Sequence, residues 1–280
     1  MLSDDTLQSL AERAGKAAME NAGVSPEDID CVLVSTVQAE TMSPALACDI
    51  QPALGLKCMG MDINGGCTGF IAALAVAEGL ITSGRARKLL VLSAEALSRF
   101  ADWTDRSTCV LFGDGAGAVV IGETPDSGPD AHTVLWADGK GAGFISRDGG
   151  ARLPHQAGTI PIPFLVLQGH DVFAFAVRSL AKVTNQLCEM LGTTPDKLDR
   201  VFAHQANGRI IEAVARRMKL PLEKFYLNLV STGNTSAASI PISLAEAVRK
   251  GELKDGMNIV LCGFGAGLTY AGTYMQWPYL

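Results

Sequence analysis

Apolar residues alternate along the chain between helical spacing and short continuous runs. Residues 6–21 carry apolar side chains at helical spacing and stop before Gly23, which favours a helix. Residues 29–36 (I-D-C-V-L-V-S-T) form a short apolar run, typical of a strand buried in a parallel sheet. The same alternation predicts a helix at 44–54, a strand at 57–63, a helix at 68–83, a strand at 88–94 and a strand at 112–122.

A stretch rich in Gly, Pro and Asp follows, from 124 to about 169, and the alternation then resumes. It predicts helices at 170–191, 207–218 and 235–250, and strands at 198–204, 225–230, 258–262 and 268–277. Alternating helix and strand signals indicate an α/β fold with a mostly parallel sheet. We expect an amino-terminal half at 1–125, a connecting segment at 126–168 and a carboxy-terminal half at 169–280.

The two halves repeat each other in sequence. The run I-D-C-V-L-V-S at residue 29 matches L-D-R-V-F-A-H at residue 198, and K-L-L-V-L-S at 88 matches M-N-I-V-L-C at 257. Both matches have an offset of about 169 positions. We therefore predict two duplicated α/β halves that pack as one unit.

Composition narrows the class of protein. The 280 residues are 48% apolar, enough for a substantial core, and the net charge of −6 argues against nucleic acid or an anionic membrane as main partner. The seven cysteines are odd in number and widely spaced, with no C-x-x-C pair and no metal-binding cluster. We expect reduced thiols in the cytoplasm, no metal, no signal peptide and no membrane span.

One cysteine stands where a nucleophile would. In D-I-N-G-G-C-T-G-F (62–70), Cys67 follows a small-residue turn and precedes the apolar run predicted to be a helix. Free N–H groups and the helix dipole at such a start favour the thiolate, which attacks carbonyl carbon. The alternative is a packed core cysteine, as most free cysteines are.

The repeat brings two more polar residues to the same place. Shifting Cys67 by nearly the repeat offset leads to Asn234 in S-T-G-N-T-S, another small-residue turn before a predicted helix. His204 ends the first strand of the second half. If a pseudo-twofold axis relates the halves, the three side chains converge at their junction. Taken alone, His204 could be structural and Asn234 a turn or cap residue.

Five ordered motifs resemble the β-ketoacyl-ACP synthase III family, condensing enzymes of the thiolase superfamily. They are D-I-N-G-G-C-T-G-F, T-D-R-S-T-C-V-L-F-G-D-G-A-G-A, A-H-Q-A-N-G-R-I-I, G-N-T-S-A-A-S-I-P and G-F-G-A-G-L-T. The resemblance implies a five-layered αβαβα thiolase-like fold, a homodimer, and a catalytic triad of Cys67, His204 and Asn234. It also implies an oxyanion hole from the backbone N–H groups of Cys67 and Ala266.

The implied reaction is a decarboxylative Claisen condensation that initiates fatty-acid synthesis. An acyl-CoA starter is held on Cys67 and condensed with a malonyl thioester, taken to be malonyl-ACP, without a cofactor beyond the CoA and phosphopantetheine thioesters. The resemblance assigns Arg209, Arg216 and Arg217 to docking of acyl carrier protein, where the alternative is a solvated charged face. It assigns Met42 to the partner subunit's acyl pocket, where the alternative is an ordinary loop methionine.

Other interpretations stay open. A related enzyme of a specialised pathway, such as biotin-precursor, alkylquinolone or polyketide synthesis, would use another starter or acceptor. A degradative thiolase would use Cys262 as a second cysteine, and an inactive partner subunit would only shape a dimer. Relatives usually begin with an extra segment, so we expect the first strand of the amino-terminal half to be missing, which bears on CoA binding.

Overall fold

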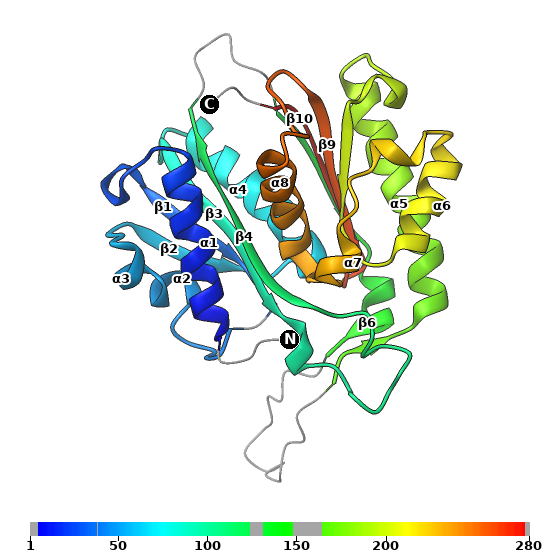
Figure 1. The fold of residues 1–280 in the computed structure, drawn as a ribbon, viewed down its shortest axis with the longest axis horizontal. Coiled ribbons are helices and arrows are strands. Elements are labelled where there is room, and N and C mark those ends of the chain that lie inside the picture. Colours follow the sequence, from blue (N-terminus) through cyan, green and yellow to red (C-terminus); the bar gives the residue numbers. More distant parts are fainter. Residues whose placement is uncertain (1–4, 38, 124–130, 148–163, 278–280) are drawn as a thin grey trace.

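The molecule is built from five layers of helices and sheets. The computed structural model describes residues 5–37, 39–123, 131–147 and 164–277. Figure 1 shows two sheets on either side of a central pair of helices, with further helices on both outer faces. This arrangement confirms the predicted αβαβα fold.

The first sheet has the strand order β2-β1-β3-β4. Strand β1 is parallel to β2 and β3, whereas β4 is antiparallel to β3. The bounds of the strands are β1 Cys31–Ser35, β2 Met59–Ile63, β3 Lys88–Ala96 and β4 Asp114–Gly122. Helix α1 (Leu7–Asn21) packs on the outer face of this sheet, and a capping box between Thr6 and Ser9 fixes its start.

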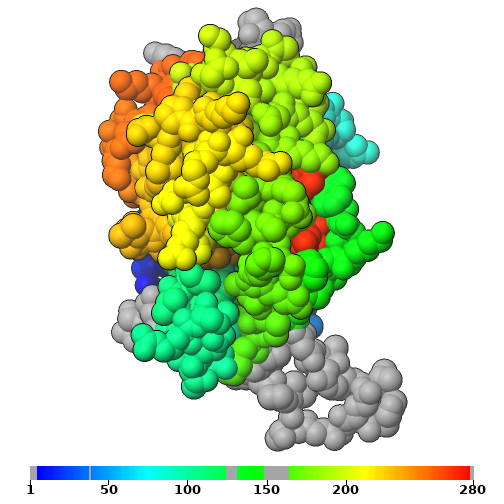
Figure 2. Space-filling model, turned by 90° about the vertical axis from the view of Figure 1, so that its right-hand side faces the viewer, coloured from blue at the N-terminus to red at the C-terminus, as the bar shows by residue number. Residues whose placement is uncertain are grey.

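The second sheet has the order β5-β10-β9-β8. Strands β8 and β9 are parallel, and β10 is antiparallel to β9 and β5. The bounds are β5 His132–Ala137, β8 Arg200–Ala203, β9 Asn258–Gly265 and β10 Thr269–Gln276; the short strands β6 Ile145–Ser146 and β7 Val166–Leu167 pair separately. Helices α5 (Gly169–Met190) and α6 (Gly208–Met218) cover the outer side and form much of the face shown in Figure 2.

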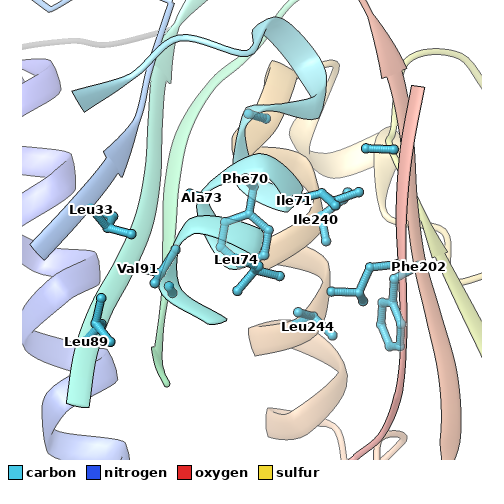
Figure 3. Packing of buried hydrophobic residues seen from close by; sticks show 14 of the residues in the cluster. Leu33, Phe70, Ile71, Ala73, Leu74, Leu89, Val91, Phe202, Ile240 and Leu244 are labelled. Atoms are coloured by element: carbon cyan, nitrogen blue, oxygen red, sulfur yellow. The ribbon is translucent and has the colours of Figure 1, made fainter. Parts of the chain in front are cut away.

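Two helices fill the space between the sheets. They are α4 (Gly69–Thr82) and α8 (Ser239–Arg249), and their side chains meet residues of both sheets in a continuous apolar core. Figure 3 shows Phe70, Ile71 and Leu74 of α4 next to Ile240 and Leu244 of α8 in this layer. Two further apolar clusters fill the spaces beneath α1 and beneath α5 and α6. Each sheet is therefore covered on both faces. Both sheets are mixed, so the expectation of a mostly parallel sheet was wrong, because β4, β5 and β10 pair antiparallel with their neighbours.

The duplicated halves of the sequence are also duplicated in space. Helices α4 and α8 each follow a three-residue 3₁₀ turn, at Gly66–Thr68 and Ser236–Ala238. Gly66 and Ser236 are the first residues of these turns and therefore occupy equivalent positions in the two halves. This equivalence refines the approximate match of Cys67 with Asn234. In the second half β5 lies outside β10, whereas β4 has no neighbouring strand on that side among the described residues.

Two local predictions need correction. The helix predicted at 44–54 is two short helices, α2 (Leu46–Asp49) and α3 (Gln51–Leu54). The strand predicted at 225–230 is a single bridge at Phe225 followed by helix α7 (Leu229–Thr232), because the Asn228 carbonyl accepts bonds that close a helical turn.

The predicted connecting segment contributes structure of its own. Strand β5 lies within 126–168 and forms the outer strand of the second sheet. The boundaries of the two halves stay a prediction. Across the described residues, no helix has both the length and the apolar character needed to span a membrane.

Candidate active site

A cavity of about 990 Å³ opens where the two halves meet. Its lining includes Cys67 from the turn before α4, His204 from the end of β8, Asn234 from the turn before α8, and Ala266 from the β9–β10 turn. The structure therefore brings together the three side chains and the backbone group predicted from sequence. They come from four separate segments, which only the duplicated fold places side by side.

The position of Cys67 is set by a close approach of backbone. Gly66 adopts a positive φ of 55°, and Thr68 Oγ1 lies 2.8 Å from the Gly65 carbonyl oxygen and 3.0 Å from Thr269 Oγ1, so its single proton can serve either neighbour. A Cβ at Gly265 would lie 2.9 Å from both the N and the Cβ of Cys67, so strand β9 reaches this turn only with a glycine there. The cysteine is thus wedged between the α4 turn and β9.

The protonation state of Cys67 differs from the sequence-based expectation. Burial raises the pKa of its thiol to about 11, although the hydroxyl of Ser236 opposes this rise. The nearby carboxyl of Glu95 raises it further. Cys67 lies in the 3₁₀ turn, two residues before α4 begins, and is half-buried at the cavity. The expectation of an acidified thiol was wrong, since loss of hydration outweighs the effect of the helix start.

His204 is buried and neutral. Its backbone N–H donates to the Cys262 carbonyl at 2.8 Å, and its Nδ1 lies 2.8 Å from the hydroxyl of Ser239. Burial lowers the pKa of the imidazole to about 4. The Ser239 hydroxyl is also 2.8 Å from the carbonyl of Ser236, so its single proton can serve either neighbour. When Ser239 donates to Nδ1, the ring carries its proton on Nε2.

Asn234 is held from both its backbone and its side chain. Its N–H donates to the Leu111 carbonyl at 2.8 Å, and its carbonyl accepts from Gly113 N–H at 2.9 Å. Phe112 and Gly113 thus pair with Asn234 directly before strand β4 begins at Asp114. The side-chain Oδ1 accepts from the Ser236 N–H at 2.9 Å, which leaves the two N–H groups of Nδ2 for the cavity.

Ala266 lies against the turn that carries Cys67. Its backbone N is 3.5 Å from the Cβ position of Gly66, and its carbonyl accepts from Thr269 Oγ1 at 3.0 Å. Thr269 also contacts Thr68, so the β9–β10 turn and the Cys67 turn are joined by hydroxyl groups. This linkage keeps the N–H groups of Cys67 and Ala266 near one another at the cavity.

Sequence reasoning missed four residues that support the site. Ser236 and Ser239 contact the reactive side chains, and Glu95 lies buried behind Cys67. Gln205 fixes the loop after His204, since Nε2 donates to the carbonyls of Ala203 and Tyr226. The i, i+3 pair of serines within G-N-T-S-A-A-S was visible as a signal. Nothing in the sequence around Glu95 marks its burial.

Two family models match the chain. "3-Oxoacyl-[acyl-carrier-protein (ACP)] synthase III" matches residues 61–139, and the corresponding "C terminal" model matches residues 188–277. A β-ketoacyl-[acyl-carrier-protein] synthase III from Fusobacterium nucleatum is 45% identical over 280 residues, covering 99% of this chain and 85% of the relative. The chain belongs to the β-ketoacyl-ACP synthase III family. Members of this family are acyltransferases that form a carbon–carbon bond.

Solved structures of the family have the same fold. The 3-oxoacyl-[acyl-carrier-protein] synthase III from Aquifex aeolicus superposes with a TM-score of 0.92 at 37% identity, covering 99% of this chain and 86% of that one. The enzyme from Pseudomonas aeruginosa gives a TM-score of 0.92 at 35% identity, with coverage of 99% and 85%. These matches confirm the predicted thiolase-like fold.

The remaining predicted residues of this synthase III chain lie away from the reactive groups. Arg209, Arg216 and Arg217 are exposed on α6, where Arg216 is 3.9 Å from Glu212. Met42 is 90% exposed and does not line the cavity. Cys262, the candidate second cysteine of a thiolase, is fully buried within β9, where burial raises its pKa to about 12.

Proposed function

We propose that the protein condenses an acyl-CoA starter with a malonyl thioester, malonyl-ACP in the first instance, and so initiates fatty-acid synthesis. The observation that carries this proposal is the convergence of a thiol, a neutral imidazole and a carboxamide on one cavity in a chain of the synthase III family. Cys67, His204 and Asn234 supply these groups, and they act without a metal or a redox cofactor.

In the first step Cys67 takes the acyl group. Its sulfur attacks the thioester carbonyl, the carbon–sulfur bond to coenzyme A breaks, and the thiol proton leaves with coenzyme A as its own thiol. The oxyanion formed on the way needs fixed donors, and we assign this role to the backbone N–H groups of Cys67 and Ala266, since both residues line the cavity. The covalent intermediate divides a difficult bond formation into two easier steps.

In the second step the malonyl thioester loses its carboxylate as carbon dioxide. The electron pair of the broken bond forms an enolate, whose oxygen accepts from Nε2–H of His204 and from Nδ2 of Asn234. The enolate carbon then attacks the acyl carbonyl on Cys67, the carbon–sulfur bond to Cys67 breaks, and the cysteine leaves as a thiolate that takes up a proton from solvent while the β-ketoacyl thioester is released. A neutral His204 suits this role, and the low pKa of its imidazole keeps it neutral throughout the physiological range.

Charge at the cavity suits a phosphate-bearing thioester. The guanidinium of Arg147 lies 3.7 Å from the ring centre of Phe100, and both residues line the cavity. This stacking holds a cation where the phosphates of CoA or phosphopantetheine would pass. The exposed Arg209, Arg216 and Arg217 on α6 form a basic patch on an otherwise acidic protein, which supports docking of an acidic acyl carrier protein.

We further propose a homodimer in which Met42 reaches the partner's acyl pocket. The 90% exposure of this large apolar side chain supports a role that another subunit completes. The seven widely spaced cysteines, none paired in the described structure, support a cytoplasmic location.

A specialised pathway is the second candidate. The chain is 35% identical to the priming β-ketosynthase of the R1128 polyketide biosynthetic pathway, with a TM-score of 0.91. The same site chemistry would then act on another starter or acceptor. A panel of acyl-CoA starters assayed with malonyl-ACP and with malonyl-CoA decides between the two.

The proposed function is tested by following the condensed product by mass spectrometry. The wild type should form a 3-oxoacyl thioester and carbon dioxide in equal amounts. The His204→Ala and Asn234→Ala variants should lose about 10²–10³ in rate, while still accepting the acyl group. Cys48→Ala, which removes an exposed cysteine on α2, is the control for Cys67→Ala. Condensation that persists in Cys67→Ala would contradict the proposal.

A further inference from the structure

Ser236 contacts Asn234 and Cys67 directly and is linked to His204 through Ser239. It is the first residue of the 3₁₀ turn before α8 and is 1% exposed. Its N–H donates to Asn234 Oδ1 at 2.9 Å, and its hydroxyl donates to the sulfur of Cys67 at 3.5 Å. Its carbonyl oxygen lies 2.8 Å from the hydroxyl oxygen of Ser239, which is also 2.8 Å from Nδ1 of His204.

The backbone of Ser236 is in a conformation that favours glycine. Its φ is 51°, and the equivalent residue in the first half, Gly66, has a φ of 55°. A side chain at such a position is strained, and positions of this kind concentrate at functional sites. The first half uses the residue without a side chain, so the hydroxyl in the second half indicates a contact that a glycine would not make.

Glu95 lies on the other side of this hydroxyl. It is 1% exposed near the end of β3, and its Oε2 accepts from the Val37 N–H at 3.1 Å. Its Oε1 has no hydrogen bond of ordinary geometry within the described structure, although the side chain of Ser236 and the N–H of Ala237 lie next to the carboxyl. Burial raises the pKa of Glu95 to about 8.

The ionisable groups that face this pair are few. Cys67 lies in front of it and His204 lies beyond Ser239. Strand β4 presents Gly115 opposite Glu95, and the adjacent Asp114 turns its carboxylate to Ser98. The ion pair of Arg99 with Glu40 follows the end of β3 at a more exposed place. The charge of Glu95 therefore acts chiefly on the sulfur of Cys67.

We propose that Ser236 and Glu95 form a buried pair behind Cys67 that sets how readily its thiol ionises. The hydroxyl of Ser236 stabilises the thiolate by donating to sulfur, and the carboxyl of Glu95 allows that thiolate only while it is itself protonated. Two negative charges would otherwise share one desolvated space. This inference rests on the proposed function for its meaning, because it assigns positioning residues to the nucleophile of the condensation.

The first test is the pH dependence of alkylation of Cys67 by iodoacetamide. Ser236→Ala keeps the N–H and carbonyl of residue 236 and removes the donor to sulfur. A hydrogen bond to a charged group is strong enough that we expect about tenfold slower alkylation of Cys67 at pH 8, with a higher apparent pKa. Ser236→Gly, which introduces the residue that the first half has at this position, removes the same hydroxyl without backbone strain and should show the same slower profile. Ser179→Ala, a buried serine on α5, is the matched control.

The second test uses Glu95→Gln, which should make alkylation of Cys67 faster, whereas Ser236→Ala should make it slower. In the wild type the alkylation rate should rise with pH and then flatten above pH 8, as Glu95 ionises and opposes the thiolate. Glu95→Gln should match the wild type at pH 7 and become severalfold faster by pH 9.5. Glu246→Gln, a carboxylate on α8 that pairs with Lys250, should follow the wild type.

The two variants together make the outcome decisive. An alkylation profile of Ser236→Ala equal to that of Ser179→Ala, or a slower Glu95→Gln at high pH, would overturn the pair. Alkylation needs no thioester substrate, so this readout stands even if acyl-CoA fails to load the protein, which would count against the proposed function alone. Loss of folded protein in Ser236→Ala is recognised by its melting curve, and the Ser236→Gly and Glu95→Gln profiles then decide.

Discussion

Gly265→Ala offers a steric test of how the nucleophile is positioned. The added methyl group would lie 2.9 Å from the N and the Cβ of Cys67, whereas ordinary contacts begin near 3.4 Å. The Cys67 turn must therefore move by about 0.5 Å. Gly263→Ala provides the matched control, because its methyl group would lie 3.5 Å from the Cys67 carbonyl oxygen, which is an ordinary contact.

The expected effect follows from that displacement. A shift of about 1 Å in a catalytic group costs about 10²-fold in rate, and loss of one oxyanion donor costs about 10²–10³. We expect Gly265→Ala to slow acylation of Cys67 by about 10- to 100-fold. Overpacking should also lower the free energy of unfolding by about 1–3 kcal/mol. Gly263→Ala should stay within about threefold of the wild-type acylation rate.

The assay is acylation by a short acyl-CoA, quenched in acid at intervals and measured as intact mass. A melting curve of each variant separates loss of folded protein from loss of rate. Wild-type acylation in Gly265→Ala would refute the reasoning that β9 fixes the Cys67 turn. Equal losses of acylation rate in Gly265→Ala and Gly263→Ala would also contradict the reasoning, because only the methyl group at residue 265 comes too close to Cys67.

Three further results are expected. Between pH 6.5 and 4 the free energy of unfolding of the wild type, measured with urea, should fall by about 3 kcal/mol relative to that of His204→Gln. The unfolded chain takes up a proton in this range, whereas the buried imidazole, with its pKa of about 4, does not. An equal pH dependence of the two free energies would contradict a neutral buried ring. Joint reversal of Arg209, Arg216 and Arg217 to Glu should raise the KM for malonyl-ACP about tenfold and leave that for malonyl-CoA unchanged, whereas equal effects would remove the docking role. Met42→Ala should change the preferred starter length in a panel of acyl-CoAs while sparing acetyl-CoA, and an unchanged preference would contradict its place in the partner's pocket.

The alternation of patterns predicted an α/β fold, because buried strands and apolar helices have distinct periods, whereas the five layers were expected from the family resemblance. The alternation failed where local hydrogen bonds set the backbone. The 44–54 helix divides into two short helices in front of Asp62, whose carboxylate accepts from the N–H groups of Leu46 and Ala47. The apolar run at 225–230 looked like a strand, but Asn228 closes a helical turn there. Strand β5 was missed inside the connecting segment because its pairing with β10 spans more than a hundred residues.

The sequence predicted the three reactive residues but not the residues that contact them. The repeat offset led from Cys67 towards Asn234, and His204 followed from the end of a strand. The state of the thiol was misjudged, since desolvation depends on how tightly β9 closes over Cys67. Glu95 is a single carboxylate in an apolar strand, and its place behind the nucleophile comes from the packing of β3 against the Ser236 turn.

The most direct measurement of the central claim is the mass of the protein after incubation with a short acyl-CoA. The account predicts one added acyl group, located on the peptide that carries Cys67, and discharge of that group when malonyl-ACP is added. Acylation of another residue, or an acyl group on Cys67 that malonyl-ACP does not remove, would contradict it.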